Sequence, residues 1–511
     1  MQHRSTTQEQ NEQSAIEASR EVAPGADDTE GAAIAPPTIK TGVIQSGKLA
    51  GLSMWRAIWV LAFPVLMQQL LFACVGLVDK MLAGRLPQDM VRPGLDAVGV
   101  GSYMAWLTGI AMSGLGVGGQ VLIARGMGMG DRNLTHTALG RACTLSMIWG
   151  AAVSVIMLAL VKPIASASGL SGQSEVFFSQ YVFWIAVAMP FTGLMSVGEM
   201  CMYGAGETLA PSLIAMWVNV VNIITSWMFS GVEMKFGDFT LHNPFHFNMH
   251  VSGIALGTAL SSVVGALLTF RKLRRGMKDL RLEYSSLGVD RDMIWRICRL
   301  GVPTFFEGMA MWGVNLFVLM FISRIEHIEN VGSGLQGAHI IAVQWESFSF
   351  LPGFAIGIAA GALAGQNLGA GNAREASRAI VRCSMIACII MGSLGLVFIF
   401  CGRWLTLFVS SDPIHLQHTP NLLRICGAIQ VFFALSMVVR QGLRGAGDTF
   451  WTLVITSFSS YGIRLPLAYV LGVTFQLGLE GIWYGLCGEL VIRGLLFTGR
   501  FVQGGWKRLA V

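Results

Sequence analysis

The sequence predicts an all-α integral membrane protein with 12 transmembrane helices in two parallel-repeat six-helix bundles. Three observations support this prediction. The composition is 53% hydrophobic and 13% charged, with a mean hydropathy of +0.59, whereas soluble domains carry about 25% charged residues. Twelve apolar segments have about the 20 residues that a helix needs to cross a 30 Å hydrocarbon core. The chain also repeats its landmarks, so that its two halves are similar.

The repeat is displaced by 241 positions at two places. The pentapeptide Gly-Ala-Gly-Glu-Thr at 204–208 returns as Gly-Ala-Gly-Asp-Thr at 445–449, and Gly-Met-Gly at 128–130 returns as Gly-Ala-Gly at 369–371. Internal repeats of this kind are typical of secondary transporters. Because each half holds an even number of predicted spans, both halves have the same orientation in the membrane.

The predicted spans set the domain boundaries. They lie at 55–82, 98–123, 138–161, 177–202, 209–232, 251–270, 294–323, 337–364, 379–401, 421–440, 450–475 and 480–501. Residues 1–50 are polar and are expected to form a disordered cytoplasmic tail. Helices 1–6 then form an N-lobe at 51–271, a basic cytoplasmic linker occupies 272–293, and helices 7–12 form a C-lobe at 294–511.

Lys and Arg in the loops predict the orientation, because basic residues are retained on the cytoplasmic side. The loops that follow even-numbered spans hold seventeen of them, including Arg440 and Arg444, and the opposite loops hold six. Both termini are therefore predicted to be cytoplasmic, in a multi-pass protein of the cell membrane. The net charge of +6 is explained by this topology and does not indicate nucleic acid as a partner. Membrane lipids are expected partners, and a monomer is the expected state.

Asp79 is the acidic residue of predicted span 1. It lies 15 residues after Pro64, near the outer end of the span, with Lys80 beside it. An ionised group inside a span costs about 2.5–3.5 kcal/mol on insertion scales, so it needs a partner, a water-filled cavity or a function. Lys80 can extend to the interface, whereas an inward-facing Asp79 needs a cation, a proton or a structural partner.

Spans 5 and 6 face each other with neutral polar groups. These are Asn219, Asn222, Thr225, Ser226 and Thr258. A carboxylate combined with neutral oxygens suits a hard monovalent cation. Hydrogen bonding between helices explains each amide or hydroxyl equally well when it is taken alone.

A second acidic pair is predicted in the other half. Glu307 lies near the middle of span 7, and Glu346 lies in span 8 at a similar depth. The two carboxyl groups could share a proton or hold a cationic substrate. The alternative is structural pairing with Arg464 or Arg493. Glu489 is four residues before Arg493, and this helical spacing predicts that the two neutralise one another.

At these residues the chain resembles the multidrug and toxic compound extrusion (MATE) family of a wider superfamily that exports drugs, lipid-linked oligosaccharides and polysaccharides. The resemblance covers residues 52–508. Its motifs are Leu-Ala-Phe-Pro at 61–64, Val78-Asp79, the turn at 126–131, the pentapeptide at 204–208, Gly-Val-Pro at 301–303, Gly-Gln-Asn-Leu-Gly-Ala-Gly at 365–371, Leu-Arg-Gly-Ala-Gly-Asp at 443–448, Arg464-Leu465-Pro466 and Gly505-Trp506-Lys507.

The resemblance implies a cavity between the lobes and export of organic, chiefly cationic, compounds in exchange for Na⁺ or H⁺. It also implies a Na⁺ site at Asp79, Asn222 and Thr258. The position where the family often has a second carboxylate is Ser226. No organic cofactor is implied.

The resemblance also bears on the C-lobe acids. Glu307 is similar to a span 7 acid of some family members, and Glu346 to a span 8 glutamate of others. The matching span 10 acid falls on the apolar Phe433.

Two other function classes have their own sequence requirements. A flippase or exporter of a lipid-linked saccharide uses the same architecture, and it would favour a cationic cavity that matches phosphates. An intramembrane enzyme would need a His/Asp, Ser/His or zinc-binding constellation within the spans, but most of the nine histidines fall in loops. We therefore expect a transporter and not an enzyme.

Overall fold

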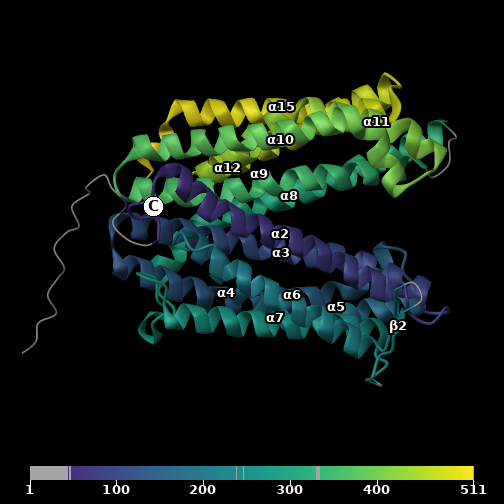
Figure 1. The fold of residues 1–511 in the computed structure, drawn as a ribbon, viewed down its shortest axis with the longest axis horizontal. Coiled ribbons are helices and arrows are strands. Elements are labelled where there is room, and N and C mark those ends of the chain that lie inside the picture. Colours follow the sequence, from purple (N-terminus) through teal and green to yellow (C-terminus); the bar gives the residue numbers. More distant parts are fainter. Residues whose placement is uncertain (1–43, 45–47, 237–238, 246, 330–333, 510–511) are drawn as a thin grey trace, which may run out of the picture. The chain divides into compact units, whose positions relative to one another are not determined.

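The computed structural model describes residue 44 and residues 48–236, 239–245, 247–329 and 334–509 of the protein. The tail predicted at 1–50 lies almost entirely outside the described residues. Two sets of long helices make up the described chain, and Figure 1 shows the first set in purple to teal and the second in green to yellow. The linker between them contains a short 3₁₀ turn, η1 (Tyr284–Ser286).

The N-lobe contains six long helices. They are α2 (Met54–Ala83), α3 (Val91–Met129), α4 (Arg132–Ala167), α5 (Gln173–Gly204), α6 (Leu209–Ser230) and α7 (His250–Arg275). The loop after α6 forms a small antiparallel hairpin of β1 (Met234–Phe236) and β2 (Phe239–Leu241), in which Lys235 pairs with Thr240. Most helices extend a turn or more beyond the predicted spans, because the apolar pattern marks only the part within the hydrocarbon core.

The C-lobe repeats this arrangement with more interruptions. Its elements are α8 (Arg291–Glu329), α9 (Gly334–Gly369), α10 (Ala373–Val409), α11 (Pro413–Ala428), α12 (Gln430–Gly445), α13 (Thr449–Ser457), η2 (Phe458–Arg464), α14 (Leu465–Tyr469), η3 (Val470–Thr474), α15 (Gly478–Gln503) and η4 (Gly505–Arg508). Span 10 is a pair, α11 and α12, with a bend of 56°. Span 11 contains two π-helical segments, η2 and η3, around Pro466, which has no backbone N–H to donate.

All twelve predicted spans correspond to helical segments. Within the described residues, nine single helices are long and apolar enough to cross a membrane, or ten spans when the bent pair is included. The other two are the segment broken by η2 and η3, and α15, which carries Glu489 and Arg493 in its middle.

The backbone repeats where the sequence repeats. Gly206 and Gly447 have φ angles of +78° and +95°, a left-handed region that favours glycine. An acidic residue follows each of these glycines, and each acid forms an ion pair. Lys48 lies 2.5 Å from Glu207, and Arg500 lies 2.8 Å from Asp448. The two halves therefore share local conformation and interactions as well as letters.

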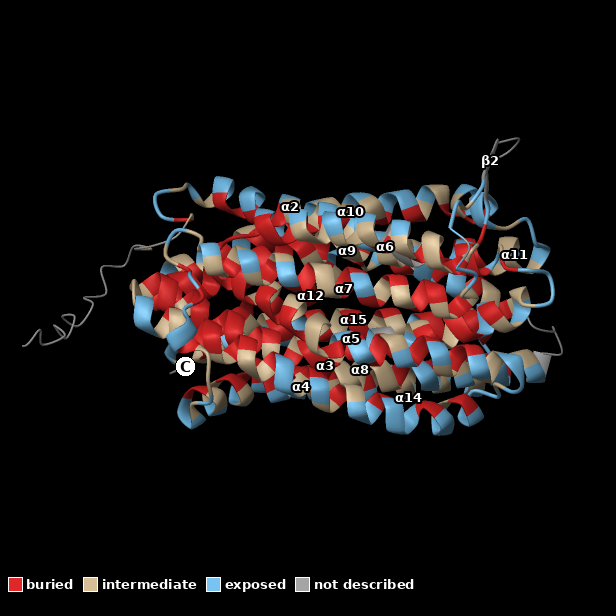
Figure 2. Ribbon diagram, turned by 90° about the horizontal axis from the view of Figure 1, so that it is seen from below, coloured by how far each residue is buried: buried red, intermediate tan, exposed pale blue. Residues whose placement is uncertain are grey.

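The lobes pack together through α3 and α9. These are the most enclosed of the described spans, since 67% and 72% of the residues in their most apolar stretches are buried, against 17% in α6. We call the end of the helices where α7 ends and α8 begins the linker end. Gly114 of α3 meets Gly301 of α8 so closely that a Cβ on Gly114 would lie 2.8 Å from the Gly301 carbonyl oxygen. Figure 2 shows the buried residues, in red, gathered along these inner helices.

Polar contacts also join the lobes at the linker end. The Gln366 side chain of α9 donates to the carbonyl oxygen of Gly204 at 2.8 Å. The Arg125 side chain of α3 donates to the carbonyl oxygen of Ala446 at 3.0 Å. Both acceptors lie in the repeated Gly-Ala-Gly turns, so the duplicated turns serve as docking points for the opposite lobe.

Candidate functional site

A cavity of about 520 Å³ lies in the C-lobe and is closed on one side by α3 of the N-lobe. Its aromatic lining residues are Tyr103, Trp106, Trp312, Phe350, Phe433 and Trp483. Its charged lining residues are Glu346, Arg440, Arg464 and Arg493. Apolar walls with a few converging polar groups are typical of sites for organic molecules.

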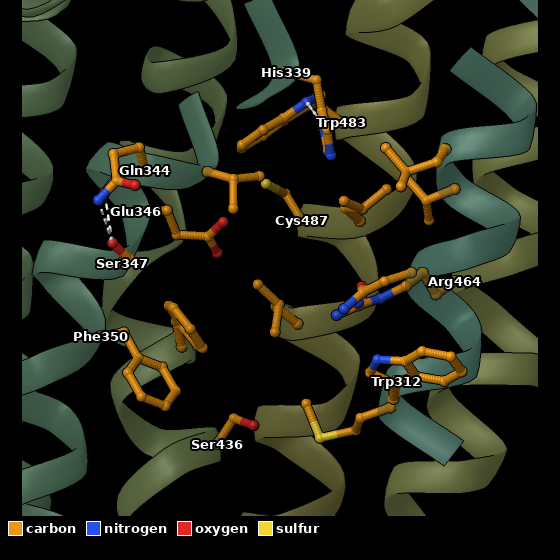
Figure 3. A pocket seen from close by; sticks show the side chains of 18 of the residues that line it. Trp312, His339, Gln344, Glu346, Ser347, Phe350, Ser436, Arg464, Trp483 and Cys487 are labelled. Atoms are coloured by element: carbon orange, nitrogen blue, oxygen red, sulfur yellow. Dashed lines mark hydrogen bonds between the residues drawn. The ribbon is translucent and has the colours of Figure 1, made fainter. Parts of the chain in front are cut away.

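Glu346 and Arg464 reach into the cavity from different elements. Figure 3 shows the Glu346 carboxylate and the Arg464 guanidinium on opposite sides of the same space, from α9 and η2. Among the described residues, no hydrogen bond or ion pair of Glu346 is seen. Glu346 is therefore the carboxylate that a bound molecule can reach.

Glu307 is fully buried next to this cavity. Its carboxylate lies 2.6 Å from Arg444 and 3.4 Å from Arg440, both on α12. It also accepts hydrogen bonds from Thr456 at 2.8 Å and Thr452 at 3.1 Å. Charge pairs and two hydroxyl donors satisfy a carboxylate that could not remain ionised alone in an apolar interior.

The predicted pair of Glu307 and Glu346 is therefore not brought into contact. Glu307 is paired with Arg440 and Arg444, which the loop count had placed outside the membrane. The structure puts both at the end of α12, four residues apart and on one helix face. The spacing of four residues could have indicated that both arginines share a helix face. The prediction missed this because it ended span 10 at residue 440.

Glu489 anchors the other arginines of the cavity. It lies 2.7 Å from Arg493 and 2.9 Å from Arg464, and its own side chain is fully buried. The predicted pair of Glu489 and Arg493 is confirmed. The same carboxylate also binds Arg464 and so holds it across the cavity from Glu346.

The predicted cation site of the N-lobe is partly assembled. The Asn222 side chain of α6 donates to the Thr258 hydroxyl of α7 at 3.0 Å. Ser226 instead donates its hydroxyl proton to the carbonyl oxygen of Ile254 at 3.1 Å. The lone pairs of the Ser226 hydroxyl oxygen can therefore still bind a cation. The Oδ1 atoms of Asp79 and Asn222 are both buried, and neither has a hydrogen-bond partner in the described part of the chain.

These oxygens fit a hard monovalent cation by chemistry. No hydrogen bond joins Asp79 to Asn222 or Thr258 among the described residues. The described residues also contain no group of three His, Cys, Asp or Glu side chains that could hold a metal ion. The candidate set is one carboxylate, one amide oxygen and hydroxyl oxygens.

Comparison with known proteins decides the family. The MatE family model matches residues 64–228 and 303–470, one match in each half of the repeat. The chain belongs to the MatE family. The matched segments begin at Pro64 and Pro303, the equivalent prolines of the first helix in each lobe.

Relatives of this MatE protein cover nearly its whole length. It is 26% identical over 457 residues to a probable multidrug resistance protein NorM from Thermotoga maritima, covering 88% of this chain and 93% of that protein. It is 25% identical over 466 residues to the multidrug resistance protein PmpM of Pseudomonas aeruginosa, covering 88% and 91%.

Solved structures confirm the fold of two six-helix lobes. An outward-facing multidrug resistance MATE transporter superimposes with a TM-score of 0.78 at 19% identity, covering 94% of this chain and 100% of that one. A transporter from Pyrococcus furiosus, described as having a binding pocket of reverse polarity, gives a TM-score of 0.77 at 19% identity and covers 94% and 98%. The family is one of membrane transporters, so this MatE protein is a multi-pass membrane protein and not an enzyme.

One acidic residue of the MatE chain was missed by sequence reasoning. Glu199 of α5 accepts a hydrogen bond from the Gln68 side chain of α2 at 2.6 Å and a hydroxyl hydrogen bond from Tyr203. Its position follows from the repeat, because Glu199 and Tyr203 lie 241 positions before Arg440 and Arg444. Comparison of helices 4 and 10 across the repeat would have found it.

Proposed function

We propose that this protein exports organic compounds from the cell by alternating access, driven by an inward gradient of Na⁺ or H⁺. The observation that carries the proposal is the aromatic and charged cavity between α3 of one lobe and the helices of the other. Its volume suits a drug-sized molecule. The relatives named as multidrug resistance proteins, such as PmpM, support this function.

The orientation follows from the basic linker. We infer that the linker end faces the cytoplasm and that both termini lie there, since Lys and Arg are retained on that side. In this conformation the contact between Gln366 and Gly204 joins the lobes at that end, and Gly114 meets Gly301 in the half of the helices nearer to it. The state described here is therefore suited to release toward the outside.

Asp79 is our candidate coupling group for Na⁺ or H⁺. Its unpartnered Oδ1 lies in an apolar helix, and a cation or proton would neutralise it. Asn222, Thr258 and Ser226 offer neutral oxygens on the neighbouring helices. One charge that moves down 100 mV supplies about 2.3 kcal/mol, which is enough to drive substrate uphill by more than tenfold.

The proposal for the charge of the substrate rests on Glu346 and the arginines. A cationic group on the substrate would pair with Glu346, and its rings would stack on the aromatic walls. When all groups are ionised, the four arginines Arg440, Arg444, Arg464 and Arg493 exceed the carboxylates of Glu307, Glu346 and Glu489 by one charge. A substrate with an anionic group beside its cation would fit this balance best.

The test of this function is dye efflux in inverted membrane vesicles, with Na⁺ and H⁺ gradients imposed separately. Asp79→Asn should abolish the gradient dependence of efflux. Asp89→Asn, the same change on an exposed loop, is the matched control and should leave it intact. Gradient-coupled efflux that survives Asp79→Asn unchanged would remove Asp79 as the coupling group, and vesicles that move no dye would count against drug export.

A second candidate function is export of an amphiphile with a phosphate group, such as a lipid-linked saccharide. Arg440, Arg464 and Arg493 in the cavity wall favour it, because guanidinium groups bind phosphate oxygens. Vesicles that contain fluorescent phospholipid or polyprenyl phosphate distinguish the two functions. Gradient-dependent movement of the phosphate lipid, in vesicles that move no dye, would decide for this alternative.

A further inference from the structure

Among the described residues, Glu199 has hydrogen-bond partners but no positive one. The groups that act on it are the neutral amide of Gln68 and the phenol of Tyr203. No Lys, Arg or His among the described residues interacts with it from the packed helices. Glu307, by contrast, has two arginines in the equivalent place of the other lobe. An unpaired carboxylate inside a membrane protein is costly when ionised and is therefore suited to bind a proton.

Within the part of the chain that the structure describes, no other charged group acts on Glu199. On the face toward the C-lobe, Tyr203 packs with Val65, Ala355 and Ile358. On the opposite face of α5, the neighbouring Gly198 lies against Thr269 of α7. Among the described residues, the titratable group that acts on Glu199 is thus Tyr203, which belongs to the same helix.

The hydroxyl protons around Glu199 can be counted. Tyr203 lies within hydrogen-bond distance of both Glu199 and the Gln68 carbonyl oxygen, the latter at 3.0 Å, but has one proton to donate. Ser212 also has two acceptors for its one proton, Gln68 Oε1 at 3.2 Å and the Thr208 carbonyl oxygen at 2.8 Å.

Two arrangements give every hydroxyl proton an acceptor. When Glu199 is ionised, Tyr203 donates to it, and Ser212 donates to Gln68. When Glu199 carries a proton, it donates to Tyr203, Tyr203 donates to Gln68, and Ser212 donates to Thr208. In both states the Gln68 amide donates to Glu199 at 2.6 Å. Only hydroxyl protons reorient, so the site accepts or releases one proton without moving a heavy atom.

We propose that Glu199 is a proton-binding site of the N-lobe, separate from Asp79, and that Gln68, Tyr203 and Ser212 hold it in both charge states. Gln68, Tyr203 and Ser212 are buried, whereas Glu199 is only partly buried, so a proton can reach it. The site lies where α9 of the C-lobe packs on the N-lobe, and proton binding would remove a charge from this contact. This role in transport rests on the proposed function, but proton binding itself does not.

Infrared spectroscopy tests the site directly. The full-length protein in lipid nanodiscs is titrated with acid and base, and the carbonyl band of protonated carboxyl groups is recorded. Glu199→Gln should lose one titrating carboxyl band that Asp79→Asn retains. Glu233→Gln, which changes an exposed loop acid, is the matched control and should keep the band that Glu199→Gln loses. Spectra of the wild type and Glu199→Gln that agree at every pH would overturn the proposal.

Tyr203→Phe provides a second test if Glu199→Gln folds poorly. Phenylalanine keeps the ring and removes the hydroxyl that donates to ionised Glu199, so the protonated band should persist to higher pH than in the wild type. An unchanged titration would show that Tyr203 does not hold the site. These readouts do not need transport, so a wild type that moves no dye would count against the proposed function and leave the proton site to be judged by its spectrum.

Discussion

Glu199 and Arg440 occupy the same place in the repeat and bind to equivalent positions on the first helix of their own lobes. They lie 241 residues apart. Glu199 accepts a hydrogen bond from Gln68, whereas Arg440 donates one to Glu307. The acid stands on the fourth helix in one lobe and on the first helix in the other. The contact between these helices is thus duplicated with its polarity inverted.

This inversion gives the two lobes different electrostatics on one scaffold. In the C-lobe the acid is neutralised by two arginines, so its charge is fixed. In the N-lobe the acid has only neutral partners among the described residues, so we expect its charge to change when it binds a proton. We therefore expect ion coupling in the N-lobe and substrate binding mainly in the C-lobe.

Glu307→Gln should lower the stability of the protein. The change leaves Arg440 and Arg444 buried without their carboxylate, and removal of one partner from a buried pair costs about 3–5 kcal/mol. The measurement is thermal unfolding in detergent. Glu283→Gln in the exposed linker is the control. If Glu307→Gln unfolds at the wild-type temperature, the pair does not stabilise the C-lobe.

Gly114→Ala should weaken the contact between α3 and α8. The new Cβ would lie 2.8 Å from the Gly301 carbonyl oxygen, which is a backbone atom and cannot move aside as a side chain can. We therefore expect the free energy of unfolding to fall by about 1–3 kcal/mol. Gly109→Ala on the same helix is the matched control, since its Cβ would meet nothing within 4 Å. Thermal unfolding of both variants checks the prediction, which fails if their midpoints move together.

Glu346→Gln should reduce transport of cationic dyes and spare neutral ones. The amide keeps the size of the side chain but removes the negative charge in the cavity. A loss of about 1.4 kcal/mol of binding would raise the apparent KM about tenfold. Competition between one cationic and one neutral dye in vesicles measures this ratio. Equal effects on both dyes would exclude a charge role for Glu346.

Glu489→Gln should shift selectivity toward anionic compounds. It releases Arg464 and Arg493 from their shared carboxylate, and their charges then face the cavity. We expect anionic dyes to gain against cationic dyes in the same vesicles, together with some loss of stability. Because Arg464→Gln removes one of these charges, the double variant should reverse the gain. If the double variant is as selective for anionic dyes as Glu489→Gln, the charge of Arg464 does not cause the shift in selectivity.

The spans could be predicted because transmembrane helices need about 20 apolar residues wherever they pack. The pair of Glu489 and Arg493 was also predictable, since its partners are one helical turn apart. The bend between α11 and α12 was not, because no proline stands at Ile429. The π-helical segments around Pro466 were likewise missed, since hydropathy does not report backbone hydrogen bonding.

The sequence by itself determined the membrane-spanning helices, the twofold repeat and the family, because these depend on hydropathy and on landmarks within one stretch of chain. Only the tertiary structure decided which charges are free. The sequence left Glu307 open to bind a substrate or a proton, but in the structure α12 places Arg444 2.6 Å from it. Sequence reasoning did not select Glu199, which the structure places 2.6 Å from Gln68 of α2. Whether a buried carboxylate stays ionised depends on the partners that other helices bring to it, and those partners are 137 and 131 residues away in the chain.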